Sequence, residues 1–173
     1  MAKVYTERLM LENAQIDYRN FSGKVSQYNR NGERNFVVLL DPEQAEELSE
    51  IGWNVKFKEP REEGDAPKIF LPVAVSYRGY RPPRVVVLTD RGRTTLDESE
   101  LNVLDWAYIK HVDLIINPYH WEVMDKNGEM NSGIKAYLDS AYITIQENPF
   151  EEKYAEFPEV SSDEVQIDVD VVE

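Results

Sequence analysis

The sequence predicts a mostly β fold, a small mixed antiparallel barrel with helices inserted between its strands. Several short runs alternate apolar and polar residues, which is the period of a half-buried strand. Asn31-Gly32 lies in a polar stretch between two such runs and is a strong hairpin-turn signal. The helical segments do not alternate regularly with the strands, which disfavours a parallel sheet. A chain of 173 residues is long enough for one domain with its own core.

The first strand is expected at Leu9–Ile16, and Phe36–Leu40, an apolar and β-branched run, is expected to be the second. A helix should follow at once. Asp41 suits the N-cap, Pro42 suits the first helical position, and Gly52 should end the helix after about Ile51.

The remaining elements follow from the same patterns, alternation for half-buried strands and continuous apolar runs for buried ones. The expected strands are Trp53–Phe57 with Lys56 and Lys58 on its basic face, Ile69–Tyr77, Val85–Leu88, Asp113–Val123 and Ala136–Gln146. Thr95–Ile109 reads as a second helix, with Leu101, Leu104 and Tyr108 on one stripe. The stretch 125–133 reads as a turn.

The acidic charge is concentrated at the C-terminus. The formal net charge is −14, and residues 147–173 contain ten acidic residues and one lysine, which leaves −5 for residues 1–146. We therefore expect a domain over residues 1–148 and an acidic, flexible tail over residues 149–173. The tail could compete for a cationic groove, bind replication or recombination proteins, or serve solubility alone.

Catalytic and metal-binding patterns are weak in this sequence. There is no cysteine, and His111 and His120 are nine residues apart without a ligand motif around them. The glycines stand singly, so no phosphate-binding loop is apparent, and no G-x-S-x-G elbow occurs. We expect a protein that is not an enzyme and that needs no metal or cofactor. The N-terminus lacks a signal-peptide core, and no apolar run is long enough for a membrane span, so we expect a cytoplasmic, soluble protein.

Cationic and aromatic residues gather in three stretches, most clearly in SYRGYRPPRVVVLTDRGR, residues 76–93. Single-stranded nucleic acid is held by a positive groove for phosphates and by aromatic faces for unstacked bases. Arginine suits this role because its planar group pairs with phosphate and also stacks on bases. The candidate DNA-binding residues are Lys24, Tyr28, Arg30, Arg34, Trp53, Lys56, Tyr77, Arg78, Tyr80, Arg81, Arg84, Arg91 and Arg93.

Several of these residues have simpler interpretations. Trp53 and Tyr77 share a face with apolar neighbours and fit a core at least as well as a binding surface. Lys56 and its neighbour Lys58 could pair with the acidic helix. Tyr28 and Tyr80 lie in polar, turn-rich surroundings and are favoured as surface aromatics.

Four pieces of the sequence, GERNF, GWNVK, the RPP step and LDWAYIKHVDLIINP, resemble phage-encoded single-stranded-DNA-binding proteins of OB-fold type. The resemblance covers roughly residues 18–146. It implies an OB-fold-like, five-stranded antiparallel barrel with inserted helices and extra strands. It also implies sequence-independent binding of single-stranded DNA during phage replication or recombination in the host cytoplasm. A homo-oligomer remains an open alternative.

Two rival functions belong to other classes. An acidic inhibitor that mimics nucleic acid would explain the charge of −14 but not the clustered arginines. A nuclease or another nucleic-acid enzyme is a third, weaker hypothesis.

Overall fold

The computed structural model describes residues 7–79, 81–146 and 157, and within this part of the chain nine strands form one mixed sheet. The elements in chain order are β1 (Leu9–Leu11), β2 (Gln15–Asn20), β3 (Arg34–Leu39), α1 (Pro42–Ile51), β4 (Lys56–Lys58), β5 (Lys68–Val75), β6 (Arg84–Thr89), β7 (Gly92–Leu96), the 3-10 helix η1 (Glu98–Asp105), β8 (Tyr108–Met124) and β9 (Met130–Gln146). The predicted tail, residues 149–173, lies outside the described residues apart from Phe157.

The sheet runs in the order β1-β8-β9-β5-β3-β2, with β4 added beside β5 and the pair β6-β7 added beside β9. β5 and β6 are parallel to β9, and the other pairings are antiparallel. The prediction of a mostly β, mixed fold is confirmed. The sheet has nine strands, which agrees with the extra strands expected beyond five, but two of its pairings are parallel and no ladder between described strands closes it.

Single contacts nevertheless connect the two ends of the curled sheet. The backbone N–H of Ala14 donates to the carbonyl of Val112 in β8 at 2.8 Å. Arg19 in β2 donates from one guanidinium nitrogen to the carbonyls of Leu104 and Ala107, at 3.0 and 2.8 Å. The sheet is therefore an open, OB-like barrel whose gap is bridged by side-chain and backbone hydrogen bonds.

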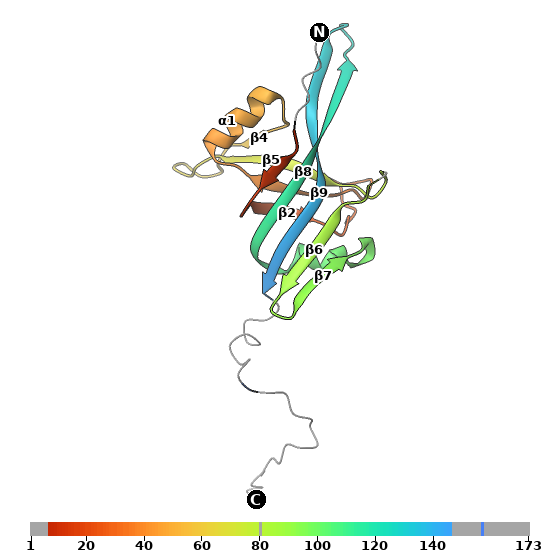
Figure 1. Cartoon of the computed structure of the whole chain (residues 1–173). Coiled ribbons are helices and arrows are strands. Elements are labelled where there is room, and N and C mark those ends of the chain that lie inside the picture. Colours follow the sequence, from red (N-terminus) through yellow and green to blue (C-terminus); the bar gives the residue numbers. More distant parts are fainter. Residues whose placement is uncertain (1–6, 80, 147–156, 158–173) are drawn as a thin grey trace, which may run out of the picture.

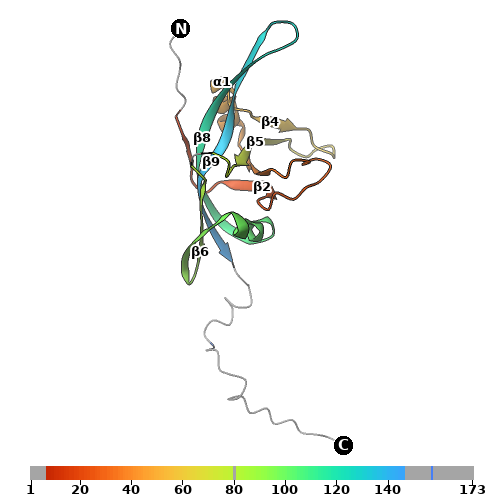
Figure 2. The same ribbon diagram turned by 90° about the vertical axis from the view of Figure 1, so that its right-hand side faces the viewer.

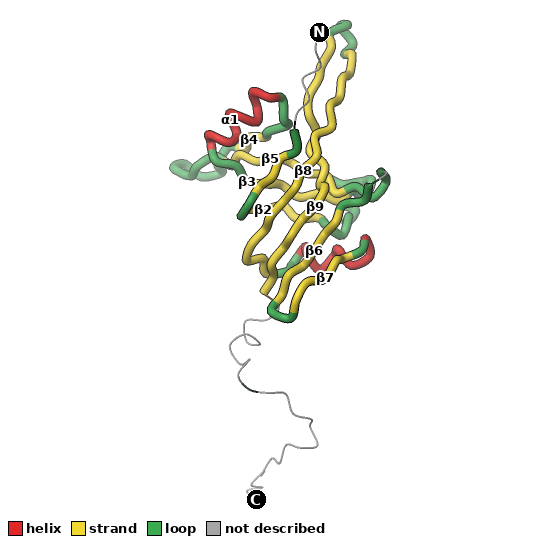
Figure 3. The backbone as a smooth tube through the Cα atoms, viewed as in Figure 1, coloured by secondary structure: helices red, strands yellow, loops and turns green. Residues whose placement is uncertain are grey.

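β8 and β9 form the long axis of the molecule, and their hairpin end extends beyond the other strands (Figure 1). In the view turned by 90°, β2, β4 and β5 all lie to one side of this hairpin (Figure 2). The two helices are short and lie at separate places on the sheet (Figure 3).

The core follows the pleat of the strands. In β5, Leu71, Val73 and Val75 are buried while Phe70, Pro72 and Ala74, on the opposite face, are half-buried. Because successive strand side chains point to opposite faces, one face of the sheet packs on the core and the other remains open. The large side chains of the core are Phe21, Phe36, Leu71, Leu101, Leu104, Ile116 and Ile143.

The first helix agrees with its predicted signals. The Asp41 carboxylate accepts from the Gln44 N–H at 2.8 Å, and the Gln44 side chain accepts from the Asp41 N–H at 3.3 Å, which forms a capping box. Gly52 ends the helix at φ 118°, a left-handed conformation that glycine adopts without steric cost. Ala45 and Leu48 are buried on its inner side.

Two sequence-based boundaries were wrong. The expected strand Leu9–Ile16 is divided between β1 and β2, with Asn13 between them at φ 50°. The expected helix Thr95–Ile109 is the shorter η1, because its first residues belong to β7 and its last to β8. Leu101 and Leu104 are buried as predicted, but Tyr108 is 74% exposed, since it lies in β8 rather than on the helical stripe.

The alternation predicted for Trp53–Phe57 also breaks. Trp53 is buried and makes an isolated bridge to Ile134, whereas Phe57 is 61% exposed. The strand itself is only β4, a three-residue edge strand whose side chains are all exposed. An edge strand this short has one neighbour, so its pleat need not match the core.

Candidate nucleic-acid interface

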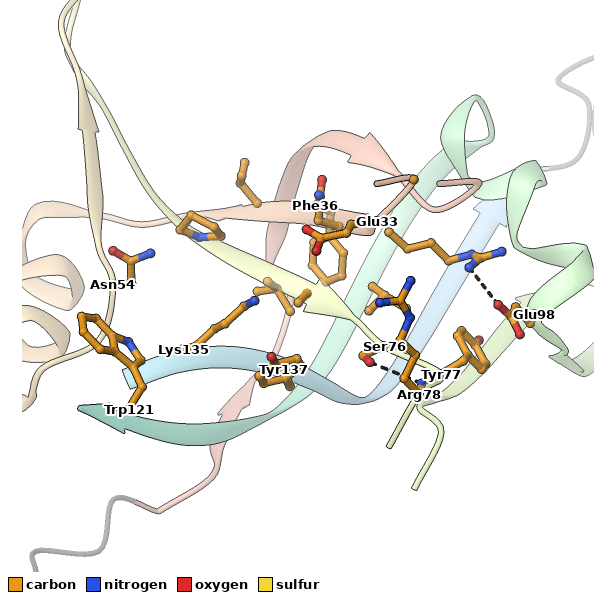
Figure 4. A pocket seen from close by; sticks show the side chains of 18 residues that line it. Glu33, Phe36, Asn54, Ser76, Tyr77, Arg78, Glu98, Trp121, Lys135 and Tyr137 are labelled. Atoms are coloured by element: carbon orange, nitrogen blue, oxygen red, sulfur yellow. Dashed lines mark hydrogen bonds and ion pairs between the residues drawn. The ribbon is translucent and has the colours of Figure 1, made fainter. Parts of the chain in front are cut away.

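A groove of about 620 Å³ lies over the open face of β3, β5 and β9. In register, Asn35 of β3 pairs with Ala74 of β5, and Ala74 pairs with Tyr137 of β9. Their side chains therefore share the face opposite the core. Figure 4 shows how the labelled side chains follow one another in space along the groove, from Trp121 and Asn54 through Lys135 and Tyr137 to Arg78 and Tyr77.

The aromatic half of the groove comes from the β8–β9 hairpin. Tyr137 makes an edge-on contact with Tyr119, with ring centroids 5.8 Å apart, and the Lys135 ammonium lies 5.1 Å from the Tyr137 centroid. Trp121 pairs with Gly133 across the two strands. A Cβ atom on Gly133 would lie 2.8 Å from Trp121 Cζ2, so the absence of a side chain there lets the indole lie directly against the backbone. The ring remains half-buried beside the groove.

At the other end of the groove basic and acidic side chains lie together, Arg34 and Arg78 with Glu33 and Glu98. Arg34 lies with its guanidinium 5.8 Å from the Tyr77 ring centroid and forms an ion pair with Glu98 at 2.9 Å. The pKa of Tyr77 is raised, mainly by burial. The charge of Arg34 lowers this pKa, and the nearby Glu98 and Asp97 raise it. Arg78 is exposed at the rim.

Two polar atoms at this end have unused hydrogen-bonding capacity. Nε of Arg34 and the hydroxyl of Tyr77 are buried and have no hydrogen-bond partner among the described residues. Buried polar atoms without partners cost free energy, so a small rearrangement that pairs them with a ligand or water is favourable.

The groove thus contains three of the predicted residues, Arg34, Tyr77 and Arg78. Lys56 lies beside it, since its register partner in β5 is Phe70 on the open face. The loop 21–33 carries Lys24, Arg30 and Tyr28, all exposed, and its last residues, Gly32 and Glu33, line the groove.

The prediction that Trp53 stacks on a base was wrong. Its side chain is 3% exposed in the core, so the indole face is not available to a base, and the alternative assignment to the core is the right one. Tyr80 lies outside the described residues.

The remaining arginines do not join the groove. The positive charge of Arg81 acts on Asp139, which also pairs with Arg8 at 3.8 Å. Arg84 begins β6, while Arg91 and Arg93 belong to the β6–β7 turn region. The length of β6 places Arg84 roughly 17 Å from the turn that carries Arg91. The stretch 76–93 is therefore spread along β6 and does not form one surface.

The candidate residues chosen from the sequence do not include Lys135, Tyr137 or Trp121, which line the groove; for Trp121 a strand end and a binding surface were equally open. The signal was present in the last strand, where Lys135 and Tyr137 alternate with the buried Ile134, Ala136 and Leu138. Pairing the two predicted strands through their turn would have placed Trp121 on the same face.

A mostly β sheet that curls around its core and carries cations and aromatic rings on one open groove is the architecture of OB-type proteins that bind single strands. The chain belongs to the family described as "Putative phage ssDNA-binding domain", whose model matches residues 1–173. The predicted class, a phage single-stranded-DNA-binding protein, is confirmed by this family.

Two solved structures are similar to this chain. One is the single-stranded DNA-binding protein from bacteriophage Enc34 in a C-terminal truncation, with 15% identity, a TM-score of 0.47, and coverage of 83% of this chain and 88% of that one. The other is gp2.5, a single-stranded DNA binding protein encoded by bacteriophage T7, with 12% identity, a TM-score of 0.42, and coverage of 96% and 99%. A search of curated protein sequences returned no significant match. Among the described residues, no helix is long and apolar enough to cross a membrane.

Proposed function

We propose that the groove over β3, β5 and β9 is where this chain binds single-stranded DNA. Bases stack on Trp121 and Tyr137, and phosphates pair with Arg78 and Lys135. The observation that supports this most is the placement of aromatic rings and cations together along one open face of the sheet. Every base has a stacking face and every nucleotide a phosphate, so such a groove binds without sequence preference.

Basic residues around the groove extend its positive electrostatic potential. Lys24, Arg30 and Lys56 lie on exposed elements that border it, and they attract the phosphate backbone of a longer strand. The role is binding rather than catalysis, in the host cytoplasm, where the protein covers DNA strands during replication or recombination. Protein partners of residues 149–173 and self-association stay predictions.

Charge reversal in the groove tests this proposal. The variants Arg78→Glu and Lys135→Glu, and their combination, are titrated against fluorescent oligothymidylate by anisotropy at several salt concentrations. Each removed phosphate contact should lower the slope of log affinity against log salt by about 0.7. The double variant should bind far more weakly than the wild type.

The matched control is Lys126→Glu, which makes the same charge change at the exposed tip of the β8–β9 hairpin, away from the groove lining. It should leave affinity close to that of the wild type. Equal loss in the control and the groove variants would mean that net charge alone governs binding. Unchanged binding by the double variant would place the DNA elsewhere.

A further inference from the structure

A second aromatic and cationic cluster lies on the open face of the sheet, outside the groove. Tyr18 is 45% exposed, and the ammonium groups of Lys58 and Lys68 lie 5.4 and 5.1 Å from its ring centroid. Lys58 also donates to the Tyr18 hydroxyl at 3.3 Å. These residues line a pocket of about 440 Å³ together with Arg61, Glu59 and Asp65.

The backbone places Tyr18 on this face at a cost. Its φ is 46°, a left-handed conformation that is unfavourable for a bulky aromatic residue. The β2–β3 register shifts between Asp17 and Asn20, as at a bulge. Asp17 is on the open face by register, so regular alternation would direct the next side chain to the core. The irregularity instead brings the Tyr18 ring against Phe70, with centroids 6.1 Å apart, and so onto the open face.

Asp17 fixes this arrangement. One carboxylate oxygen accepts from the Tyr18 N–H at 2.8 Å, and the other accepts from the Lys68 ammonium at 3.2 Å. Lys68 is therefore engaged in holding the ring, whereas Lys58 approaches the ring from an exposed edge strand. Strained residues that the surroundings hold in place are concentrated at binding sites.

The cluster is continuous with the groove through β5. Lys68, Phe70, Pro72 and Ala74 share one face of that strand, and each successive pair is separated by roughly 7 Å. Pro72 and Ala74 line the groove, and Phe70 contacts Tyr18. A single strand lying in the groove can therefore continue along β5 to this ring.

We propose that Tyr18 and Lys58 form a second nucleotide subsite, in which a base stacks on the Tyr18 ring and a phosphate pairs with the Lys58 ammonium. Asp17 and Lys68 position the ring. This proposal rests on the proposed function, since the subsite extends the path of DNA bound in the groove. Its role is to increase the length of strand that one molecule covers.

The test is a length series of oligothymidylates, from about 4 to about 16 nucleotides, the range that one OB-type domain occupies. Tyr18→Asn removes the ring but keeps a residue that tolerates the left-handed backbone. It should bind the shortest oligonucleotides as the wild type does and bind the longer ones about five- to a hundred-fold more weakly. Tyr108→Asn removes a tyrosine that is 74% exposed at the start of β8 and should match the wild type at every length.

Two further variants report on the subsite directly. Tyr18→Trp should show additional fluorescence quenching with long oligonucleotides and none with the shortest, because a stacked indole is quenched. Lys58→Gln should lower the salt slope by about 0.7 for long oligonucleotides alone.

The outcomes separate this proposal from the previous one. If the wild type binds oligonucleotides and folded Tyr18→Asn matches it at all lengths, the subsite is refuted and the groove is not. Equal weakening at all lengths also refutes it, because Tyr18 would then act on the groove itself. If the wild type binds no oligonucleotide, the proposed function fails and the subsite with it.

Discussion

Replacing Gly133 by alanine tests whether the position of Trp121 matters for binding. The added Cβ would lie 2.8, 3.0 and 3.1 Å from three indole atoms. Carbon atoms in good contact are 3.5–4.0 Å apart, so the ring must move by about 0.7 Å or more. Gly133 does not have a positive φ, so alanine brings no backbone strain of its own.

The two expected effects differ in size. Overpacking costs about 1–3 kcal/mol, but the half-buried indole can move toward solvent, and alanine restricts the unfolded chain by about 0.4–1 kcal/mol. The free energy of unfolding should therefore fall by less than about 2 kcal/mol. Displacing one stacking surface should cost about 1–3 kcal/mol of binding, or roughly 5- to 100-fold in affinity.

Urea unfolding and oligothymidylate anisotropy at fixed salt measure the two quantities. Gly79→Ala is the matched control, because a Cβ there meets nothing within 4 Å. Trp121→Ala gives the loss expected when the ring is absent. If Trp121→Ala and Gly133→Ala both fold and both bind as the wild type does, Trp121 is not a stacking surface.

Three other changes have defined outcomes. Glu98→Gln removes the carboxylate that competes with phosphate for Arg34 and should tighten binding up to about fivefold at low salt, whereas weaker binding would contradict this. Asp41→Ala should lower the unfolding free energy by about 1 kcal/mol in urea without changing oligonucleotide affinity, because it removes a helix cap outside the groove. Burial raises the pKa of Asp139, but hydrogen bonds from Asn117 and Ser140 and nearby arginines outweigh this and lower it overall. Its carboxylate thus stabilises the fold above the unfolded pKa of about 3.9, and the stability difference from Asp139→Asn should shrink in thermal melts as the pH falls below about 4.

Local signals in the sequence predicted local structure well. The helix from Pro42 to Ile51 has its cap, first-turn proline and terminal glycine within the sequence itself. The Thr95–Ile109 boundary failed because distant groups decide it. Arg19 donates hydrogen bonds to the carbonyls of Leu104 and Ala107, and the chain from Tyr108 onward pairs with the C-terminal end of β9.

The groove was harder to predict because it depends on strand register. Counting charges selected Arg84, Arg91 and Arg93, yet β6 distributes them along its length. Trp121 and Lys135 become neighbours only through the register of the β8–β9 hairpin, and the amino-acid composition does not reveal that register. The joint occurrence of aromatic and cationic residues indicated the class of ligand correctly, whereas their grouping in space required the pairing of β5 with β9.

β9 hydrogen-bonds to β8 along nearly its whole length and to β5 and β6 on its other edge. Tyr137, which lies in the groove, is thus held on a strand that has neighbours on both edges at that point. Amide protons of β9 from Ala136 to Thr144, where the strand has neighbours on both edges, should exchange at rates set by global unfolding. If so, occupancy by DNA should slow their exchange even where they lie far from the groove.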